Sequence, residues 1–217
     1  NYLLQFTKNL RLQKFEVLKE DKRKYHQYKL REKYVNLKEK KNNLDEIYLQ
    51  LKQKVSFENL NNSNISRAEQ LFKKTNQFNF VGNRYNKADL KHKNQISKVK
   101  LVRLEDKFGK HGLIGVIIYK KDFGKIYITD FLLSCRILSR KVEEYVIYRV
   151  LKENSSLEGF IGYNKLSKNI ELISKFLEKD YFNLISKKNY PINNFIDADF
   201  IYKIKLNNSL KDASKFF

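Results

Sequence analysis

Two apolar runs joined by a short turn constrain the fold of this chain more than any other feature. Residues 112–119 are almost continuously apolar, and residues 125–133 form a second, mostly apolar run. Between them, Lys121-Asp-Phe-Gly124 has the glycine that is typical of a hairpin turn. An almost uninterrupted apolar strand is typical of a position covered on both faces, so we expect residues 112–119 near the centre of a sheet.

The rest of the sequence predicts strands and helices on either side of this hairpin. Residues 99–104 alternate apolar and basic side chains, as a half-buried strand does. The Asn-rich break at residues 59–64 offers N-cap residues for a helix that begins near Arg67. The other expected elements are an edge strand at residues 55–60, one helical turn at 87–90, helices at about 139–153 and 166–177, and strands at 157–163, 182–186 and 198–204.

These elements predict an α+β chain with a mixed, mainly antiparallel central sheet flanked by helices and an N-terminal helical extension. Residues 1–55 are rich in helix formers but have too little apolar content to fold alone, so we expect a helical connector there. Residues 56–207 are expected to form the main domain and residues 208–217 a tail. The sequence begins without methionine, and we expect an upstream domain to be missing from it.

A net charge of +21 invites a nucleic-acid interpretation, but the charge is spread along most of the chain. There are 36 Lys and 9 Arg, a bias typical of AT-rich coding. Specific nucleic-acid binding is therefore the less expected interpretation, and an acidic protein or a phosphorylated ligand would gain equally from this field. No run approaches the roughly 20 apolar residues of a membrane span. A single cysteine cannot form an internal disulfide, which is compatible with a reducing cytoplasm.

Cys135, the only cysteine, and His111, one of three histidines, are the candidates for catalysis. Cys135 follows the apolar run 125–133, and His111 lies between two glycines before the run 112–119. A thiol and an imidazole at the ends of neighbouring strands can act as nucleophile and base. The competing interpretations are a small buried cysteine and a strand-edge histidine hydrogen-bonded to backbone.

Several short motifs recur in the order of a known family. They are Arg67-Ala-Glu-Gln-Leu71, Thr75-Asn-Gln-Phe-Asn79, Arg84-Tyr85, Asp106, Phe108-Gly109, His111-Gly112, Phe131, Ser134-Cys-Arg136 and Val142-Glu143. Over about residues 10–182 they resemble the FkbH-like family, which joins a HAD-superfamily phosphatase-type domain to a C-terminal GNAT-like domain. The predicted order of strands and helices is also that of the GNAT acyltransferase fold.

This resemblance implies an acyl-transfer activity. Such proteins take a glyceryl unit from a phosphorylated donor and pass it through a cysteine to the phosphopantetheine thiol of an acyl carrier protein. Cys135 would then carry the acyl group, with His111 as base and Asp106 or Asn76 orienting its ring. The Asp-x-Asp-x-Thr motif of the HAD part is absent from this sequence. The phosphatase step would belong to an upstream HAD-like domain, of which residues 1–40 would be the tail.

The same resemblance suggests residues that bind the substrate or the carrier. Asn76, Gln77 and Asn79 can hydrogen-bond an acyl oxygen or the pantetheine amides, although a helix-terminating turn explains them equally well. Phe78 and Phe80 are expected in the core. The other candidates are Arg136 and Arg140 beside the thiol, and Lys168 and Asn169, for which a helix cap is an equal alternative. We expect no metal site.

Two departures from ordinary GNAT enzymes make coenzyme A less expected than a carrier-bound arm. Coenzyme A pyrophosphate normally lies on an Arg-x-x-Gly-x-Gly/Ala turn at a helix N-terminus. Here Ser139 and Lys141 replace the glycines, and Leu177 replaces a tyrosine that often acts as general acid. Two alternatives to the acyltransferase remain open: a non-catalytic GNAT-shaped module that docks an acidic carrier protein, and a basic nucleic-acid-binding domain.

Overall fold

The computed structural model describes residues 29–30, 32–37, 39, 43–166, 168–185, 195 and 197–217. The chain divides into two compact units, Asn1–Asn42 and Asn43–Phe217. In the first unit the described residues are helical. Most of the predicted HAD tail, residues 1–40, lies outside the described residues.

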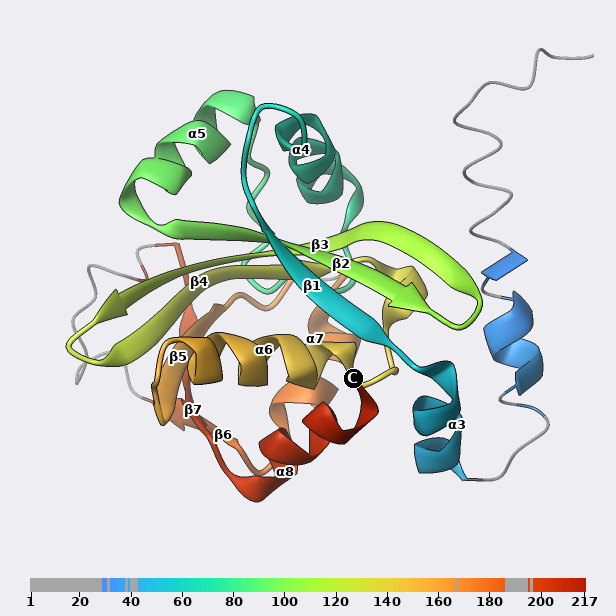
Figure 1. Ribbon diagram of the computed structural model, residues 1–217. Helices are drawn as coiled ribbons and strands as arrows, with labels where there is room; N and C mark the ends of the chain where they lie inside the picture. The colour runs from blue at the N-terminus through green and yellow to red at the C-terminus, as the bar shows by residue number, and fades with distance from the viewer. Residues whose placement is uncertain are drawn as a thin grey trace, which may run out of the picture. The chain divides into compact units, whose positions relative to one another are not determined.

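The second unit is built on one seven-stranded sheet with the order β1-β2-β3-β4-β5-β7-β6 (Figure 1). Every neighbouring pair is antiparallel except β4 and β5, which are parallel. The strands are β1 (Lys54–Asn59), β2 (Lys98–Asp106), β3 (Gly109–Asp122), β4 (Lys125–Leu133), β5 (Glu158–Tyr163), β6 (Phe182–Ile185) and β7 (Phe200–Lys205). This confirms the predicted mixed, mainly antiparallel sheet.

Helices cover both faces of the sheet (Figure 1). On one face lie α4 (Ile65–Lys74) and α5 (Lys87–Ile96); on the other lie α6 (Val142–Glu153), α7 (Ile170–Leu177) and α8 (Asn208–Asp212). The central strand β3 serves both cores: Val116 and Ile118 pack in the cluster that contains α4, and Ile117 packs in the cluster that contains α6. Its near-continuous apolar sequence therefore reflects burial on both faces, as predicted.

Local sequence signals explain several element boundaries. Asn64, in the predicted capping segment, occupies the N-cap position of α4, but its side chain makes no capping hydrogen bond and its Oδ1 accepts from Asn61 N at 2.8 Å instead. Asn86 and Asp89 form a reciprocal capping box that begins α5, and α5 runs to Ile96 rather than ending after the single predicted turn. The β3–β4 turn places Phe123 and Gly124 at positive φ, the conformation that a tight hairpin requires.

The expected domain boundaries do not coincide with the compact units. The helix α3 (Leu44–Leu51), which lies within the expected connector of residues 1–55, belongs to the second unit together with β1. Residues 208–217, expected as a tail, form α8 and the 3₁₀ helix η5 (Ala213–Phe216), and the rings of Phe216 and Tyr48 pack edge to face. Within the described part of the chain, no helix has the length and apolar character needed to cross a membrane.

The parallel strands β4 and β5 pair over only a short length. Their register covers Ile126–Ile128 against Gly159–Ile161, yet β4 continues to Leu133. Beyond that point the chain segment Phe78–Phe80 lies along β4 instead: Phe80 N donates to Phe131 O at 3.0 Å, and Leu133 N donates to Phe78 O at 3.0 Å. The segment between α4 and α5 therefore supplies the backbone partners that β5 does not.

Candidate functional site

Cys135 lies on an exposed turn directly after the central β3–β4 pair. It begins the 3₁₀ helix η2 (Cys135–Ile137), and the preceding Ser134 N donates to Ile114 O of β3 at 2.7 Å. The residue is exposed, and among the described residues its thiol has no hydrogen-bond partner. Cys135 is therefore not the buried, packed thiol of the competing interpretation.

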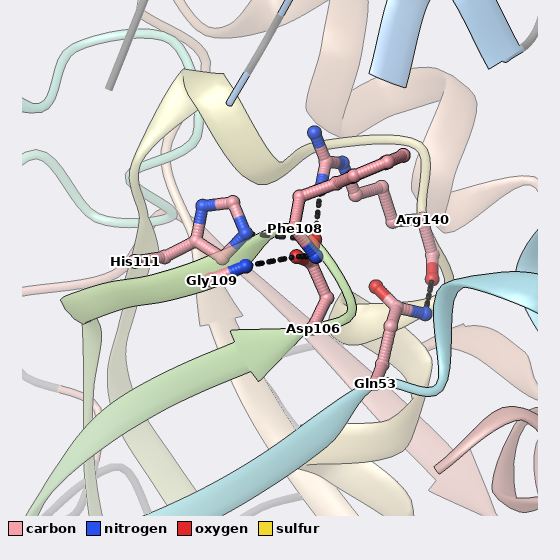
Figure 2. A network of polar contacts seen from close by, with 6 residues as sticks. All are labelled: Gln53, Asp106, Phe108, Gly109, His111 and Arg140. Carbon is pink, nitrogen blue, oxygen red and sulfur yellow. Dashed lines mark hydrogen bonds and ion pairs between the residues drawn. The ribbon is translucent and has the colours of Figure 1, made fainter. Parts of the chain in front are cut away.

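His111 is held by a buried carboxylate from the neighbouring strand (Figure 2). Its Nε2 lies 2.7 Å from Asp106 Oδ2, and its side chain is only 7% exposed. The other carboxylate oxygen of Asp106 accepts hydrogen bonds from Phe108 N at 2.8 Å and Gly109 N at 3.2 Å. The β2–β3 turn thus fixes the carboxylate, and the carboxylate orients the ring.

Arg140 completes this cluster of Asp106, His111 and Arg140, which we call the Asp106 cluster. Its Nη1 lies 3.1 Å from Asp106 Oδ2, and the Asp106 and Arg140 side chains are 0% and 1% exposed. Burial alone would raise the pKa of Asp106, but hydrogen bonds from His111 and Phe108 and the charge of Arg140 hold that pKa below its usual value. Gln53 Nε2 donates to Arg140 O at 3.1 Å from the start of β1 (Figure 2).

The Asp106 cluster bears on two of the predicted site residues. Arg140 was predicted to lie beside the thiol and contact a substrate or carrier, but its guanidinium is buried and bonded to Asp106. Asp106, predicted to orient the His111 ring, lies within hydrogen-bond distance of that ring. Arg136 lies on η2 itself, where its Nε donates to Ser134 Oγ at 3.1 Å.

His111 and Cys135 lie at the same end of the sheet. The antiparallel register pairs Gly115 with Leu133, so the start of β3 and the end of β4 are neighbours. No hydrogen bond joins the Cys135 thiol to the His111 ring within the described residues. The nucleophile–base pair therefore remains a prediction.

The Asn-rich residues act mainly inside the protein. Asn79 is 1% exposed, and its Oδ1 accepts from Gly82 N at 3.0 Å. Asn169 is 0% exposed and donates to Asn79 O at 2.8 Å, which ties α7 to this segment. Asn76 accepts from Arg84, while Gln77 and Lys168 are exposed. The geometry favours turn and cap roles for Asn79 and Asn169.

The loop between η2 and α6 keeps the backbone of a glycine-containing turn without its glycines. Ser139 and Lys141 have φ values of 62° and 65°, in the left-handed region. Ser139 N donates to Glu143 Oε1 at 2.7 Å, so a side chain from the first turn of α6 folds back onto the loop. Ser139 and Lys141, which replace the glycines of the usual turn, therefore have the backbone conformation that favours glycine.

Two buried carboxylates occupy that first turn of α6. Glu143 and Glu144 are 5% and 4% exposed. Burial, together with the neighbouring Glu144, raises the pKa of Glu143 to about 7. Glu144 pairs with Lys179, and Lys141 Nζ lies 3.6 Å from the same carboxylate. We call Glu143, Glu144 and Lys179 the Glu143 cluster.

A further buried carboxylate, Asp130 on β4, was not among the predicted site residues. Its Oδ1 accepts from Asn83 Nδ2 at 2.8 Å, and its Oδ2 accepts from Thr129 Oγ1 at 3.1 Å and from Tyr85 OH at 3.3 Å. Burial raises the pKa of Asp130. A single charged residue inside an apolar strand was the signal that could have indicated it. No group of three potential metal-binding side chains occurs among the residues that the structure describes.

Comparison with known proteins identifies the fold. No protein-family model and no curated protein matches the chain. A GNAT-family acetyltransferase from Staphylococcus aureus Mu50 aligns over 71% of this chain and 100% of its own, with 12% identity and a TM-score of 0.51. N-acetylglutamate synthase from Neisseria gonorrhoeae, complexed with coenzyme A and N-acetyl-glutamate, aligns over 71% of this chain and 36% of its own, with 13% identity and a TM-score of 0.50. The chain therefore has a GNAT-like fold: a seven-stranded, mostly antiparallel sheet flanked by helices.

Proposed function

We propose that this chain is an acyltransferase domain in which the Cys135 thiol carries the acyl group. The observation that carries the proposal is the exposed thiol on the turn after β4, at the same sheet end as the His111–Asp106 pair. Acetyl transfer is the activity of the GNAT enzyme that shares this fold. That likeness concerns the fold alone, and the proposed chemistry depends on the chain's own residues.

The proposed reaction is a pair of thioester exchanges. The Cys135 sulfur attacks the carbonyl carbon of an acyl thioester, its own S–C bond forms, and the donor's S–C bond breaks to release the donor thiol. An acceptor thiol then attacks the Cys135 thioester and takes the acyl group. The two thioesters are similar in energy, so positioning contributes more than driving force.

The geometry of His111 determines which ring nitrogen can act as base. Its Nε2 faces Asp106, so in the neutral ring Nε2 carries the hydrogen donated to the carboxylate and Nδ1 keeps its lone pair. In the proposal Nδ1 takes the Cys135 proton, directly or through one water, and returns it to the departing thiolate. Asp106 then acts as a positioning residue.

The finer part of the proposal is a glyceryl-type acyl unit passed to the phosphopantetheine thiol of an acyl carrier protein. It is supported by the motif order shared with FkbH-like sequences, including Ser134-Cys-Arg136 and His111-Gly112. A net charge of +21 would favour an acidic carrier. An upstream HAD-like domain would prepare the acyl donor.

Mass spectrometry of the intact protein tests the acyl-carrier role of Cys135. Incubation with a glyceryl thioester of pantetheine should add one glyceryl mass to the wild type and none to Cys135→Ala. Because Cys135 is the only cysteine, any thioester adduct is assigned without digestion. An adduct of equal yield in Cys135→Ala, or no adduct in the wild type, would contradict the proposal.

A second candidate function is a non-catalytic module that docks an acidic carrier protein. It is favoured by the net charge of +21 and by the lack of a hydrogen bond between Cys135 and His111 among the described residues. It predicts carrier binding that weakens as salt rises, together with full activity of Cys135→Ser in the complete pathway. Loss of that activity in Cys135→Ser would exclude a purely docking role.

A further inference from the structure

We infer that the chain's own groups occupy the places in which this fold would hold coenzyme A, so that an acyl donor reaches Cys135 without a bound nucleotide. The inference rests on the proposed acyl transfer only where it names the donor. Coenzyme A would need donors for its pyrophosphate and a place for its extended, amide-bearing arm.

The phosphate-binding groups of the loop before α6 are already used within the protein. Ser139 N, which would face an anion at the start of α6, donates instead to the Glu143 carboxylate. The Arg140 guanidinium is turned into the buried Asp106 cluster, and Lys141 is directed to Glu144. A pyrophosphate at this position would have to displace a buried carboxylate and approach a second one.

Glu143 itself resembles an anion bound at a helix N-terminus. Its Oε1 accepts the loop amide, while its Oε2 is buried and has no hydrogen-bond partner in the described part of the chain. The side chains of Ser139 and Lys141 also extend from positions at positive φ, where glycine would leave room for a ligand. The loop therefore has the path of a phosphate cradle, but a carboxylate lies in it.

The place for an extended arm is filled as well. An amide-bearing arm can join a sheet by hydrogen bonding to backbone groups that lack a strand partner. Such groups would exist where β4 extends beyond its short pairing with β5. There, Phe131 O and Leu133 N bond to Phe80 and Phe78, Asn79 pairs with Leu132, and Asn164 N donates to Phe80 O at 2.9 Å.

This internal strand segment is firmly held. Phe78 and Phe80 are 2% and 0% exposed, and their rings pack on each other and on Phe131 and Phe176. Removing the segment would expose two buried phenylalanines to water, which costs free energy in proportion to the apolar surface exposed. The arm of coenzyme A would have to supply that free energy before it could lie along β4.

The structure therefore points to a donor that approaches the exposed side of η2 and presents its thioester there. A protein-bound or free pantetheine thioester meets this requirement, because it needs no pyrophosphate cradle and, when it approaches at η2, its arm does not have to lie along β4. The nucleotide part of coenzyme A should add nothing to recognition. Acetyl-CoA and acetyl-pantetheine, which differ only in the nucleotide, should acylate Cys135 with rate constants within about threefold of each other, since neither transition state gains a contact.

Binding experiments test the inference independently of acylation. In 150 mM salt, coenzyme A should raise the Tm no more than ATP at equal concentration, and both effects should vanish in 500 mM salt. Hydrogen exchange should show the amides of Phe80 and Leu133 protected and unchanged when coenzyme A is added. Saturable, salt-resistant binding of coenzyme A, or faster exchange of those amides in its presence, would overturn the inference.

A charge-matched pair of variants tests the role of Glu143, with inorganic pyrophosphate as the probe. Glu143→Ala removes the carboxylate from the cradle, and Glu171→Ala removes an exposed carboxylate from α7. Pyrophosphate affinity should rise at least tenfold more in Glu143→Ala than in Glu171→Ala, and equal changes would contradict the assignment. If Glu143→Ala does not fold, the coenzyme A and exchange measurements on the wild type still decide. Failure of Cys135 labelling would count against acyl transfer and leave these binding results intact.

Discussion

The Asp106 cluster and the Glu143 cluster are two buried groups of charges joined by one loop, and they differ in the balance of those charges. In the first, a single carboxylate lies between His111 and Arg140. In the second, two carboxylates share one helical turn with Lys179 beside them. Burial opposes ionisation in both, yet the pKa of Asp106 is lowered and that of Glu143 is raised to about 7. Around Asp106, the interactions with His111, Phe108 N and Arg140 outweigh the effect of burial on the pKa, whereas beside Glu143 the second carboxylate adds to the effect of burial.

The largest expected loss in the free energy of unfolding is that of Asp106→Asn, which removes the carboxylate charge from the Asp106 cluster. The variant keeps the shape of the side chain but removes the charge that pairs with the 1%-exposed Arg140. We expect a loss of about 3–5 kcal/mol in the free energy of unfolding at pH 7, measured in urea, as for breaking a buried ion pair. Glu105→Gln is the matched control, because Glu105 is half-exposed, pairs with the exposed Lys110 at 3.6 Å, and should cost under about 1 kcal/mol. Similar losses in both variants would contradict the comparison.

The second largest expected effect is the pH dependence that Glu143 gives to the free energy of unfolding. The unfolded carboxyl ionises near 4.5 and the folded one near 7, so between these values the unfolded chain releases a proton that the folded chain retains. Stability should therefore fall as pH rises from about 4.5 to 7 and then level off. Glu143→Gln should remove this contribution, which amounts to at most about 3 kcal/mol. Parallel stability profiles for the variant and the wild type from pH 4.5 to 8 would contradict the raised pKa.

The order of the strands along the chain was predictable from the sequence, because each strand carries a local signal. The prediction for residues 125–133 matches β4, and the expected order of strands and helices from residue 99 to residue 205 is the observed one, whereas α8 and η5 lie where a tail was expected. The pairing between Asp106 and Arg140 has no such signal, because the two residues are 34 positions apart and meet only through the fold. Similarly, Phe78 and Phe80 were expected in the core, but their backbone pairing with β4 depends on how far β5 diverges, which no local pattern records.

A smaller loss in the free energy of unfolding is expected from Lys179→Met, which removes the cation of the Glu143 cluster. Lys179 is bonded to Glu144 but is 34% exposed, so solvent screens part of the interaction and the expected loss is about 1 kcal/mol at pH 7. The charge of Lys179 also lowers the pKa of Glu143, so in the variant that pKa should move further above 7. Titration followed by NMR of a ¹³C-labelled Glu143 carboxyl measures the shift. Lys175→Met, on an exposed position of α7, should leave it unchanged.

The smallest effect on stability is expected from Cys135→Ser, although this variant should have the largest effect on acyl transfer. Cys135 is exposed and outside both clusters, so the free energy of unfolding should change by less than about 0.5 kcal/mol. Iodoacetamide should alkylate the wild-type thiol in the native state as readily as in urea, because no unfolding is needed to reach it. Asp106→Asn should instead lower stability while leaving the thiol accessible. If native Cys135 reacted only after unfolding, the distinction between the exposed turn at η2 and the two buried charge clusters would fail.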